Sequence, residues 1–294
     1  MARRRAVRRG LPAAVVAVLV IALAAAVIAL AALAIERGRG VEPTGGARPA
    51  PSFSFGADAS PSPTETVEID LTAPGPAERF FAVGDGVLWR ATAGECGGDA
   101  PVIERSDDDG ESWADVTPTY REIRQVRDLI GFAETEADIV ADLGEDCETQ
   151  ALRTFTQGTF WSPYDDLLPR STYLDGTTVA DDGERYEAPC DQPWSLRTAA
   201  SLTAVICDGT ASVWQDGAWF EVGTDVVSLD VFDGEVVGAV VDADCDGVQV
   251  TTLGAEDEPI GCAAVADPTA PAALALTDVG VRVWSGDDLV ALER

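Results

Sequence analysis

The feature that most constrains this chain is a repeated pair of short β-rich runs joined by a turn that carries Gly or Asp. One copy reads V-I-E-R-S-D-D-D-G-E-S-W-A-D-V, and the set occupies Val102–Val116, Ala151–Tyr164, Ala211–Val222, Val248–Ile260 and Val281–Leu292. Further pairs of apolar runs precede several copies, at Arg79–Ala91, Leu129–Ala141 and Leu229–Val241. Alternating apolar runs broken by D-G or Gly turns are typical of antiparallel hairpins. The chain is therefore expected to fold mainly as β-hairpins.

Two hairpins in succession make one repeating unit. Two hairpins over about 35–50 residues form a four-stranded antiparallel sheet, which is the blade of a β-propeller. The units fall at residues 78–118, 122–166, 192–223, 225–263 and 270–294, with a shorter one at 170–188. The sequence thus predicts an all-β propeller of five or six small blades, and a pair of β-sandwiches is the rival fold. The last unit is one strand short, and Thr66–Thr72 could supply the missing strand and close the ring.

The N-terminus has the pattern of a membrane anchor. Residues 1–10 carry five Arg, and an uncharged apolar run follows from Leu11 to Ile35. At ~1.5 Å per residue, this run spans the ~30 Å hydrocarbon core of a bilayer. The positive-inside rule then predicts a transmembrane helix at 11–35, with the basic head 1–10 in the cytoplasm and the rest outside the cell membrane. The alternative is a cleaved signal peptide with Ala32–Ala34 as its small-residue site, but the run exceeds the usual length of such segments.

Composition separates a linker from an acidic domain. Residues 36–65 are rich in Pro, Ser, Gly and Ala without hydrophobic periodicity, which predicts a disordered linker. The domain 66–294 carries a charge of about −35, because it holds 47 of the 51 acidic residues and 12 of the 20 basic ones. Such a surface disfavours nucleic acid and anionic lipid as partners. It suits solubility, divalent cations or a cationic partner.

Three residue types are missing. The chain has no His, Lys or Asn. The codons of Lys and Asn are AT-rich, so their absence indicates a GC-rich bacterial genome. Without His, the chain can form no Ser-His-Asp or Cys-His nucleophile pair and no His-ligated metal site. Any acid–base chemistry would depend on carboxylates, Tyr or Cys.

One turn matches a known motif. Ser106, Asp108, Gly110, Ser112 and Trp113 fit the pattern S-x-D-x-G-x-[ST]-W. In this the chain resembles the Asp-box (BNR) repeat β-propellers, which include sialidases and non-catalytic proteins similar to photosystem II assembly factors. The resemblance implies a turn between the two outer strands of a blade, away from any catalytic centre. The expected role of these five residues is structural, since Ser and Asp bond the turn backbone and Trp packs under the hairpin.

The same resemblance raises the question of sialidase activity, but the sialidase motifs are missing. Sialidases use three Arg, a Tyr assisted by Glu, and an Asp acid, with the first Arg in an Arg-Ile-Pro motif that is absent here. The available residues fit no such motif: Tyr120, Tyr164, Tyr173, Tyr186, Arg90, Arg124 and Arg153. We therefore expect no enzyme and no cofactor, but a binding or scaffolding protein at the cell envelope with an unknown protein or glycan as partner. The alternatives are an Asp-box glycosidase and the sensor ectodomain of a membrane complex.

The stretch D-A-D-C-D-G, at residues 242–247, opens like a calcium loop. An EF-hand needs a Glu at loop position 12, which is Leu253 here. The related propeller loops need Asp at position 9, which is Val250. Both closing ligands are missing, so no metal site is predicted, although weak calcium binding stays open.

The six Cys predict a disulfide framework in an exported domain. Four of them directly precede the third strand of a predicted blade, and Cys190 and Cys262 are placed in connections between blades. All six then lie on one rim of the ring, opposite the Asp-box turn. Neighbours in sequence give the pairs Cys96–Cys147, Cys190–Cys207 and Cys245–Cys262. This rim is also where a partner is expected.

Overall fold

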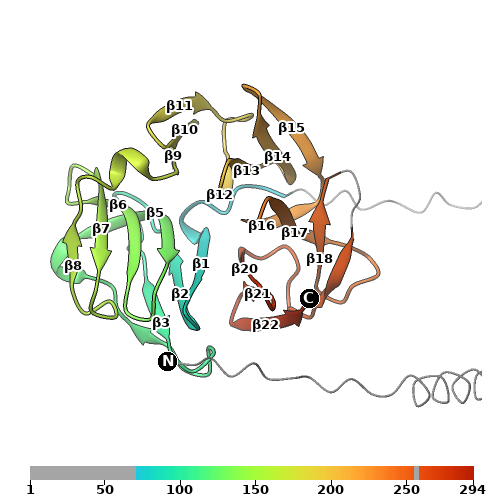
Figure 1. The fold of residues 1–294 in the computed structure, drawn as a ribbon, viewed down its shortest axis with the longest axis horizontal. Helices are drawn as coiled ribbons and strands as arrows, with labels where there is room; N and C mark the ends of the chain where they lie inside the picture. Colours follow the sequence, from blue (N-terminus) through green and yellow to red (C-terminus); the bar gives the residue numbers. More distant parts are fainter. Residues whose placement is uncertain (1–70, 255–257) are drawn as a thin grey trace, which may run out of the picture. The chain divides into compact units, whose positions relative to one another are not determined.

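The hairpins pair into six antiparallel sheets, one for each predicted unit. The sheets surround a common centre, with the first strand of most blades innermost (Figure 1). The all-β propeller is therefore confirmed with six blades, and the sandwich pair is excluded. The count is six because the short unit at 170–188 forms a sheet of its own, which has three strands.

The computed structural model describes residues 71–254 and 258–294, all within the unit Thr66–Arg294. The predicted basic head, transmembrane helix 11–35 and linker 36–65 lie outside the described residues. Among the described residues, no helix has the length and apolar character to cross a bilayer. Their helical elements are three short 3-10 turns, η1 (Gly75–Ala77), η2 (Thr119–Arg121) and η3 (Leu168–Arg170).

The strands follow the blades in chain order. The first two blades comprise β1 (Arg79–Gly84), β2 (Val87–Thr92), β3 (Ile103–Ser106), β4 (Ala114–Asp115), β5 (Ile123–Gly131), β6 (Ala137–Leu143), β7 (Glu148–Thr154) and β8 (Trp161–Pro163). The next two comprise β9 (Tyr173–Asp175), β10 (Thr178–Asp181), β11 (Glu184–Glu187), β12 (Trp194–Ala199), β13 (Leu202–Cys207), β14 (Thr210–Gln215) and β15 (Ala218–Gly223). The last two comprise β16 (Val226–Phe232), β17 (Glu235–Val241), β18 (Val248–Leu253), β19 (Pro259–Ala263), β20 (Ala272–Thr277), β21 (Gly280–Ser285) and β22 (Asp288–Glu293).

Asp-Gly pairs set the turns of several hairpins. Asp216 and Gly217 join β14 to β15 with φ of 52° and 79°, and Asp233 and Gly234 join β16 to β17 with φ of 50° and 83°. Two residues with positive φ form the type I′ turn, whose twist matches that of the flanking strands. The sequence pattern D-G therefore fixes the register of these hairpins.

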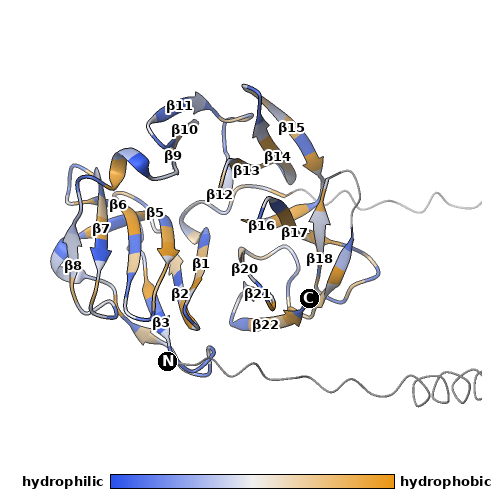
Figure 2. Ribbon diagram, viewed as in Figure 1, coloured by the Kyte–Doolittle hydropathy of each residue, from blue (hydrophilic) through white to orange (hydrophobic). Residues whose placement is uncertain are grey.

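The hydrophobic core lies in the seams between blades. Trp89 of the first blade meets Trp161 of the second, edge to face, with 6.0 Å between ring centroids. Figure 2 shows apolar residues along inner strands such as β1 and β5. Because an inner strand has a neighbouring blade on each side, it is buried on both faces, as in β6, where six of seven residues are buried, Asp138 and Asp142 among them.

The ring closes through a seam between the first and the last blade. Phe81, Leu88, Ala273, Ala275 and Trp284 form one buried cluster across it. Of the closing strand predicted at Thr66–Thr72, only residues 71 and 72 are described, and neither belongs to a strand. Residues 66–70 lie outside the described part of the chain. Leu71 instead joins a core cluster of the fifth and sixth blades. The last blade has three described strands, β20 to β22.

Three disulfides brace one end of the ring, and they join the predicted pairs Cys96–Cys147, Cys190–Cys207 and Cys245–Cys262. In a four-stranded antiparallel blade, the loop between the second and third strands shares an end of the ring with the connections to neighbouring blades. We call this end the disulfide face and the opposite end the Asp-box face. One position is corrected: Cys262 lies in β19, paired with Gln249, and not in a connection. It stands near the end of the strand, so it still reaches the disulfide face.

The third blade lacks an innermost strand. Leu174 and Gly176 line a cavity together with Glu95 of the disulfide face, whereas Ser171 and Thr172 line a cavity at the opposite end. β9 therefore runs toward the disulfide face, which is the direction of a second strand and opposite to that of β1 or β5. The segment 164–172, with its short turn η3, connects β8 to β9 and lines part of the cavity at that opposite end.

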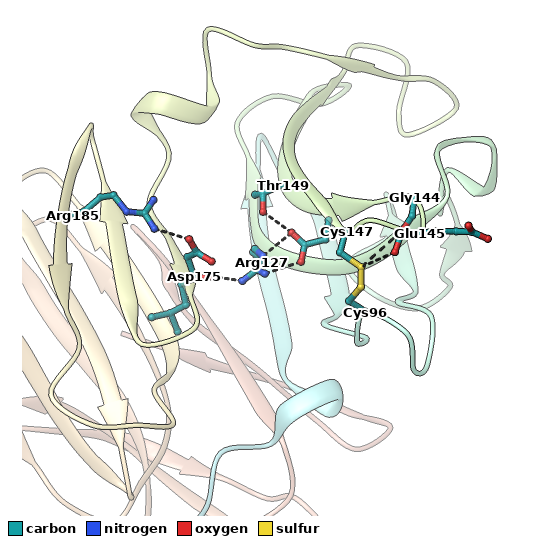
Figure 3. A network of polar contacts seen from close by, with 10 residues as sticks. Cys96, Arg127, Gly144, Glu145, Cys147, Thr149, Asp175 and Arg185 are labelled. Carbon is teal, nitrogen blue, oxygen red and sulfur yellow. Dashed lines mark hydrogen bonds and ion pairs between the residues drawn. A yellow bond between two sulfur atoms is a disulfide. The ribbon is translucent and has the colours of Figure 1, made fainter.

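Side chains hold this incomplete blade in place on both sides. Toward the fourth blade, Tyr186 stacks on Trp214 with 4.2 Å between centroids and 5° between planes. Toward the second blade, Arg127 on β5 donates to the carbonyl oxygen of Leu174 at 2.6 Å. Figure 3 shows this arginine between the two blades, close to the Cys96–Cys147 disulfide.

Candidate functional site

The Asp-box residues build a closed hydrogen-bonded turn between β3 and β4. The Ser106 hydroxyl donates to Asp108 Oδ1 at 2.7 Å and accepts from the Gly110 amide at 2.8 Å. Asp108 also accepts from the Ser112 amide at 2.9 Å and from the Ser112 hydroxyl at 2.5 Å. These bonds, those from Ser112 first, lower the pKa of Asp108 to about 2. Every polar side chain of the motif is therefore engaged within the turn.

The Asp-box turn also packs on the last blade. Asp109 forms an ion pair with Arg282 on β21 at 2.8 Å. A side chain at Gly110, where φ is +89°, would collide with Leu289 on β22. Trp113 packs beside Phe81, with Arg90 over its ring at 3.9 Å. The motif thus fastens the seam that closes the ring, and it lies away from the ring centre.

The loop that resembles a calcium site is held by its own backbone and a disulfide. The Asp244 amide donates to Asp242 Oδ1 at 2.8 Å, and Cys245 is tied to Cys262. Among the described residues, no group of three or more acidic, Cys or His side chains has the geometry to hold a metal ion.

The Tyr and Arg residues considered for sialidase chemistry do not gather as a set in one site. The Tyr120 hydroxyl bonds the backbone of Trp161, and the Tyr186 hydroxyl donates to Asp181 at 2.7 Å. Arg90 pairs with Glu104 in the first blade, and Arg153 pairs with Asp138 in the second. Of the set, Arg153 and Tyr164 meet on the second blade, with 4.8 Å between the guanidinium and the ring centroid, whereas Arg90, Tyr120 and Tyr186 lie elsewhere.

The largest opening at the ring centre is a cavity of about 420 Å³ at the Asp-box face. The ends of the innermost strands line it, and Asp128 on β5, Arg197 on β12 and Asp230 on β16 are its central charges. A smaller cavity of about 260 Å³ occupies the disulfide face, and Leu196 borders both. Burial raises the pKa of Asp128 and of Asp230 to about 6, although Arg197 acts in the opposite direction.

Two of the central carboxylates serve to join blades. Asp230 accepts from the amide of Leu276 on β20 at 2.8 Å and from that of Val231 at 2.9 Å, which links β16 to β20. Glu78 accepts from the Ser195 amide at 2.8 Å, and burial raises its pKa as well. The central charges are therefore largely committed to holding the innermost strands together.

An exposed aromatic patch borders the central cavity on the second blade. We define it as Ile130, Phe132, Phe155 and Tyr164, which are 47%, 40%, 49% and 38% exposed. Phe132, Phe155 and Tyr164 surround the guanidinium of Arg153 at 4.8, 5.9 and 4.8 Å from their ring centroids. That guanidinium is held by Asp138 through two bonds of 2.6 Å, and Asp138 and Ile130 also line the cavity. The aromatic patch and the central cavity are thus one continuous surface.

Comparison with known proteins finds distant similarity to solved structures. No family model matches the sequence, and no curated protein matches it. Among solved structures, YCF48 bound to a D1 peptide is 17% identical with a TM-score of 0.38, covering 76% of this chain and 81% of that one. YCF48 from Cyanidioschyzon merolae is 13% identical with a TM-score of 0.36, covering 76% and 85%. Trypanosoma rangeli sialidase, in complex with 2,3-difluoro-KDN, is 11% identical with a TM-score of 0.40, covering 73% and 52%.

The aromatic patch was missed in the sequence because its residues come from separate turns and strands and because the neighbouring third blade is incomplete. Ile130 pairs with Asp138 and Asp138 with Arg153, so these side chains stand on one face of the second blade, the face toward the third. A complete third blade would place its innermost strand against that face. The available signal was the short third unit, 170–188, which predicts an incomplete neighbour. The partner was expected on the disulfide face, whereas the larger cavity and the aromatic patch lie at the opposite end.

Proposed function

We propose that this protein is a membrane-anchored, extracytoplasmic propeller that binds a partner, without catalysis, on the Asp-box face. The observation that carries the proposal is the aromatic patch beside the central cavity. Aromatic and Arg side chains that are exposed together are characteristic of binding surfaces, and soluble proteins rarely expose such groups without a partner.

The non-catalytic part of the proposal rests on how the polar groups are used. Asp230 is occupied by two backbone amides, and Asp138 is paired with Arg153. A general acid or nucleophile needs an oxygen that is free to reach substrate. Asp128 is the remaining central carboxylate, and a glycosidase normally requires two.

The location outside the cytoplasm is supported by the three disulfides, because structural disulfides persist in oxidising compartments. The Arg-rich head and the apolar run 11–35 supply the anchor in this proposal. In intact cells, external protease should remove the domain after residue 65 while the full-length chain fractionates with membranes. A soluble form that begins near residue 35 would contradict the anchor.

The binding surface is tested by photo-crosslinking in the cells that express the protein. A photoreactive phenylalanine analogue at Phe155 should give a discrete adduct, because the partner would cover this ring. The same analogue at Phe220, which is 51% exposed on β15 of the fourth blade, is the matched control and should give none. Equal yields at the two positions, or no adduct at Phe155, would refute binding at the patch.

A further inference from the structure

Carboxylates without ion-pair partners border the aromatic patch. Glu134 and Glu136 follow Phe132 in the turn between β5 and β6, and Asp165 and Asp166 follow Tyr164. The described part of the chain contains no ion pair that involves any of these four, although it contains seven others. Two guanidiniums touch the backbone of this border: Arg170 Nε donates to the backbone oxygen of Asp166, and Arg105 Nη2 donates to that of Glu134 at 3.3 Å. Arg105 is itself paired with Asp107, so the four carboxylates leave the border with a net negative charge.

The centre of the patch, in contrast, is apolar and electrically neutral. Arg153 and Asp138 compensate each other through two bonds of 2.6 Å, so the aromatic rings surround a neutral pair. Two of the three rings are Phe, which offer no hydrogen-bonding group. A complementary surface must therefore be apolar at its middle and basic at its edge.

The shape of the patch favours a protein over a sugar. Phe155 and Tyr164 stand at 55° to each other with centroids 6.1 Å apart. Two rings inclined in this way form no shared flat platform for a sugar, whereas an apolar side chain can insert into the wedge between them. The net charge of −31 would also draw a basic protein toward this chain over long range.

We infer that the partner is a protein that places apolar side chains on Ile130, Phe132, Phe155 and Tyr164 and basic side chains against the carboxylates around them. The inference rests on the proposed function and specifies the chemistry of its partner. The apolar centre would supply most of the affinity, and the acidic border would set the partner's charge and speed association.

Two fluorescent peptides test this chemistry on the full-length protein in detergent. They share the same Leu and Phe residues and differ only in carrying Arg or Glu at the remaining positions. The Arg peptide should bind at least about 10-fold more tightly than the Glu peptide, and less tightly as salt rises. Phe155→Ser should weaken it about 10-fold, and Phe220→Ser less than about 2-fold.

Two double variants that remove the same charge distinguish the effect of the acidic border on binding from the effect of the protein's overall electrostatic field. Glu134→Gln with Asp165→Asn should weaken the Arg peptide about 3- to 10-fold and flatten its salt dependence. Asp99→Asn with Asp191→Asn removes the same charge on the disulfide face and should change affinity less than about 2-fold. Equal losses in the two double variants, or equal affinity for the two peptides, would overturn the inference. So would a neutral oligosaccharide that suppresses crosslinking at Phe155 while the Arg peptide does not; the proposed function would survive that result.

Discussion

Arg127 and Asp142 form a two-point ion pair that continues into the neighbouring blade. Arg127 Nε lies 2.8 Å from Asp142 Oδ1, and Nη2 lies 2.7 Å from Oδ2. Thr149 donates to the same Oδ1 at 2.7 Å, while Arg127 Nη1 reaches the Leu174 carbonyl (Figure 3). The Asp142 side chain is only 1% exposed, so this network crosses the interior between the second and third blades.

Replacing Arg127 by Ala should therefore be costly. It leaves the Asp142 carboxylate buried without a cation, and loss of one partner of a buried pair typically costs about 3–5 kcal/mol. Arg185→Ala is the control, because its pair with Asp175 is half exposed on both sides and such pairs contribute about 0–1 kcal/mol. Denaturant unfolding of the two variants measures the difference, and similar losses would contradict the assignment.

The Asp-box should stabilise the fold in a pH-dependent way through Asp108. Its pKa in the folded state, about 2, lies below the unfolded value. The stabilisation is thus present above the unfolded pKa of about 4 and is lost as pH falls through the folded value. Asp108→Asn should lower the melting temperature at pH 7, and the gap from the native protein should close toward pH 2. Glu111→Gln, an exposed change in the same turn, should show no such gap.

Asp128 should act in the opposite sense. Burial raises its folded pKa to about 6, so the folded protein takes up the proton more readily than the unfolded chain. Its contribution is fully present below about pH 4 and is lost as pH rises through 6. Asp128→Asn should remove this dependence, so that the melting temperature changes less between pH 5 and pH 7.5 than in the native protein. An unchanged pH profile would show that this carboxylate is not desolvated.

The disulfides should carry a large share of the stability. They join residues 51, 17 and 17 positions apart, for which a chain-entropy model gives about 3–4 kcal/mol each. Reduction should lower the melting temperature markedly. Losing both Cys190 and Cys207 should cost less than losing one, since a lone Cys can mispair. Peptide mapping without reductant checks the connectivity, and a Cys96–Cys245 peptide would be inconsistent with it.

The purified protein should show no sialidase or general glycosidase activity. The Arg-Ile-Pro motif is absent, and the polar side chains of the Asp-box are engaged in hydrogen bonds within their own turn. A fluorogenic sialoside should be hydrolysed at the rate of buffer alone. Turnover that disappears on changing Tyr164 or Arg153 would reverse this conclusion.

The sequence predicts the ring because its turns are local. An Asp-Gly pair such as Asp233–Gly234 sets a hairpin by itself, and the spacing of hairpins sets the blades. The disulfide pairs follow from the same topology. The position of Cys262 was wrong by a few residues, because periodicity does not mark where a strand ends.

The candidate site was not predictable in the same way. Phe132 and Phe155 stand in different turns, and only the pairing of β6 with β7 brings them together around Arg153. Hydrophobic periodicity reports which residues form strands, and a surface assembled from separate turns leaves no periodic signal of its own.

The seam between the first and last blades has a consequence for how the ring moves. In the described chain, the strands of these two blades belong to separate sheets, and the side chains of Asp109, Arg282, Leu289 and Trp284 join them. If this seam parts, the two blades stay tethered through the other four, at a high effective concentration for each other. Reclosing is therefore an intramolecular event. A modest set of contacts is enough to keep the ring closed while still allowing the seam to open transiently.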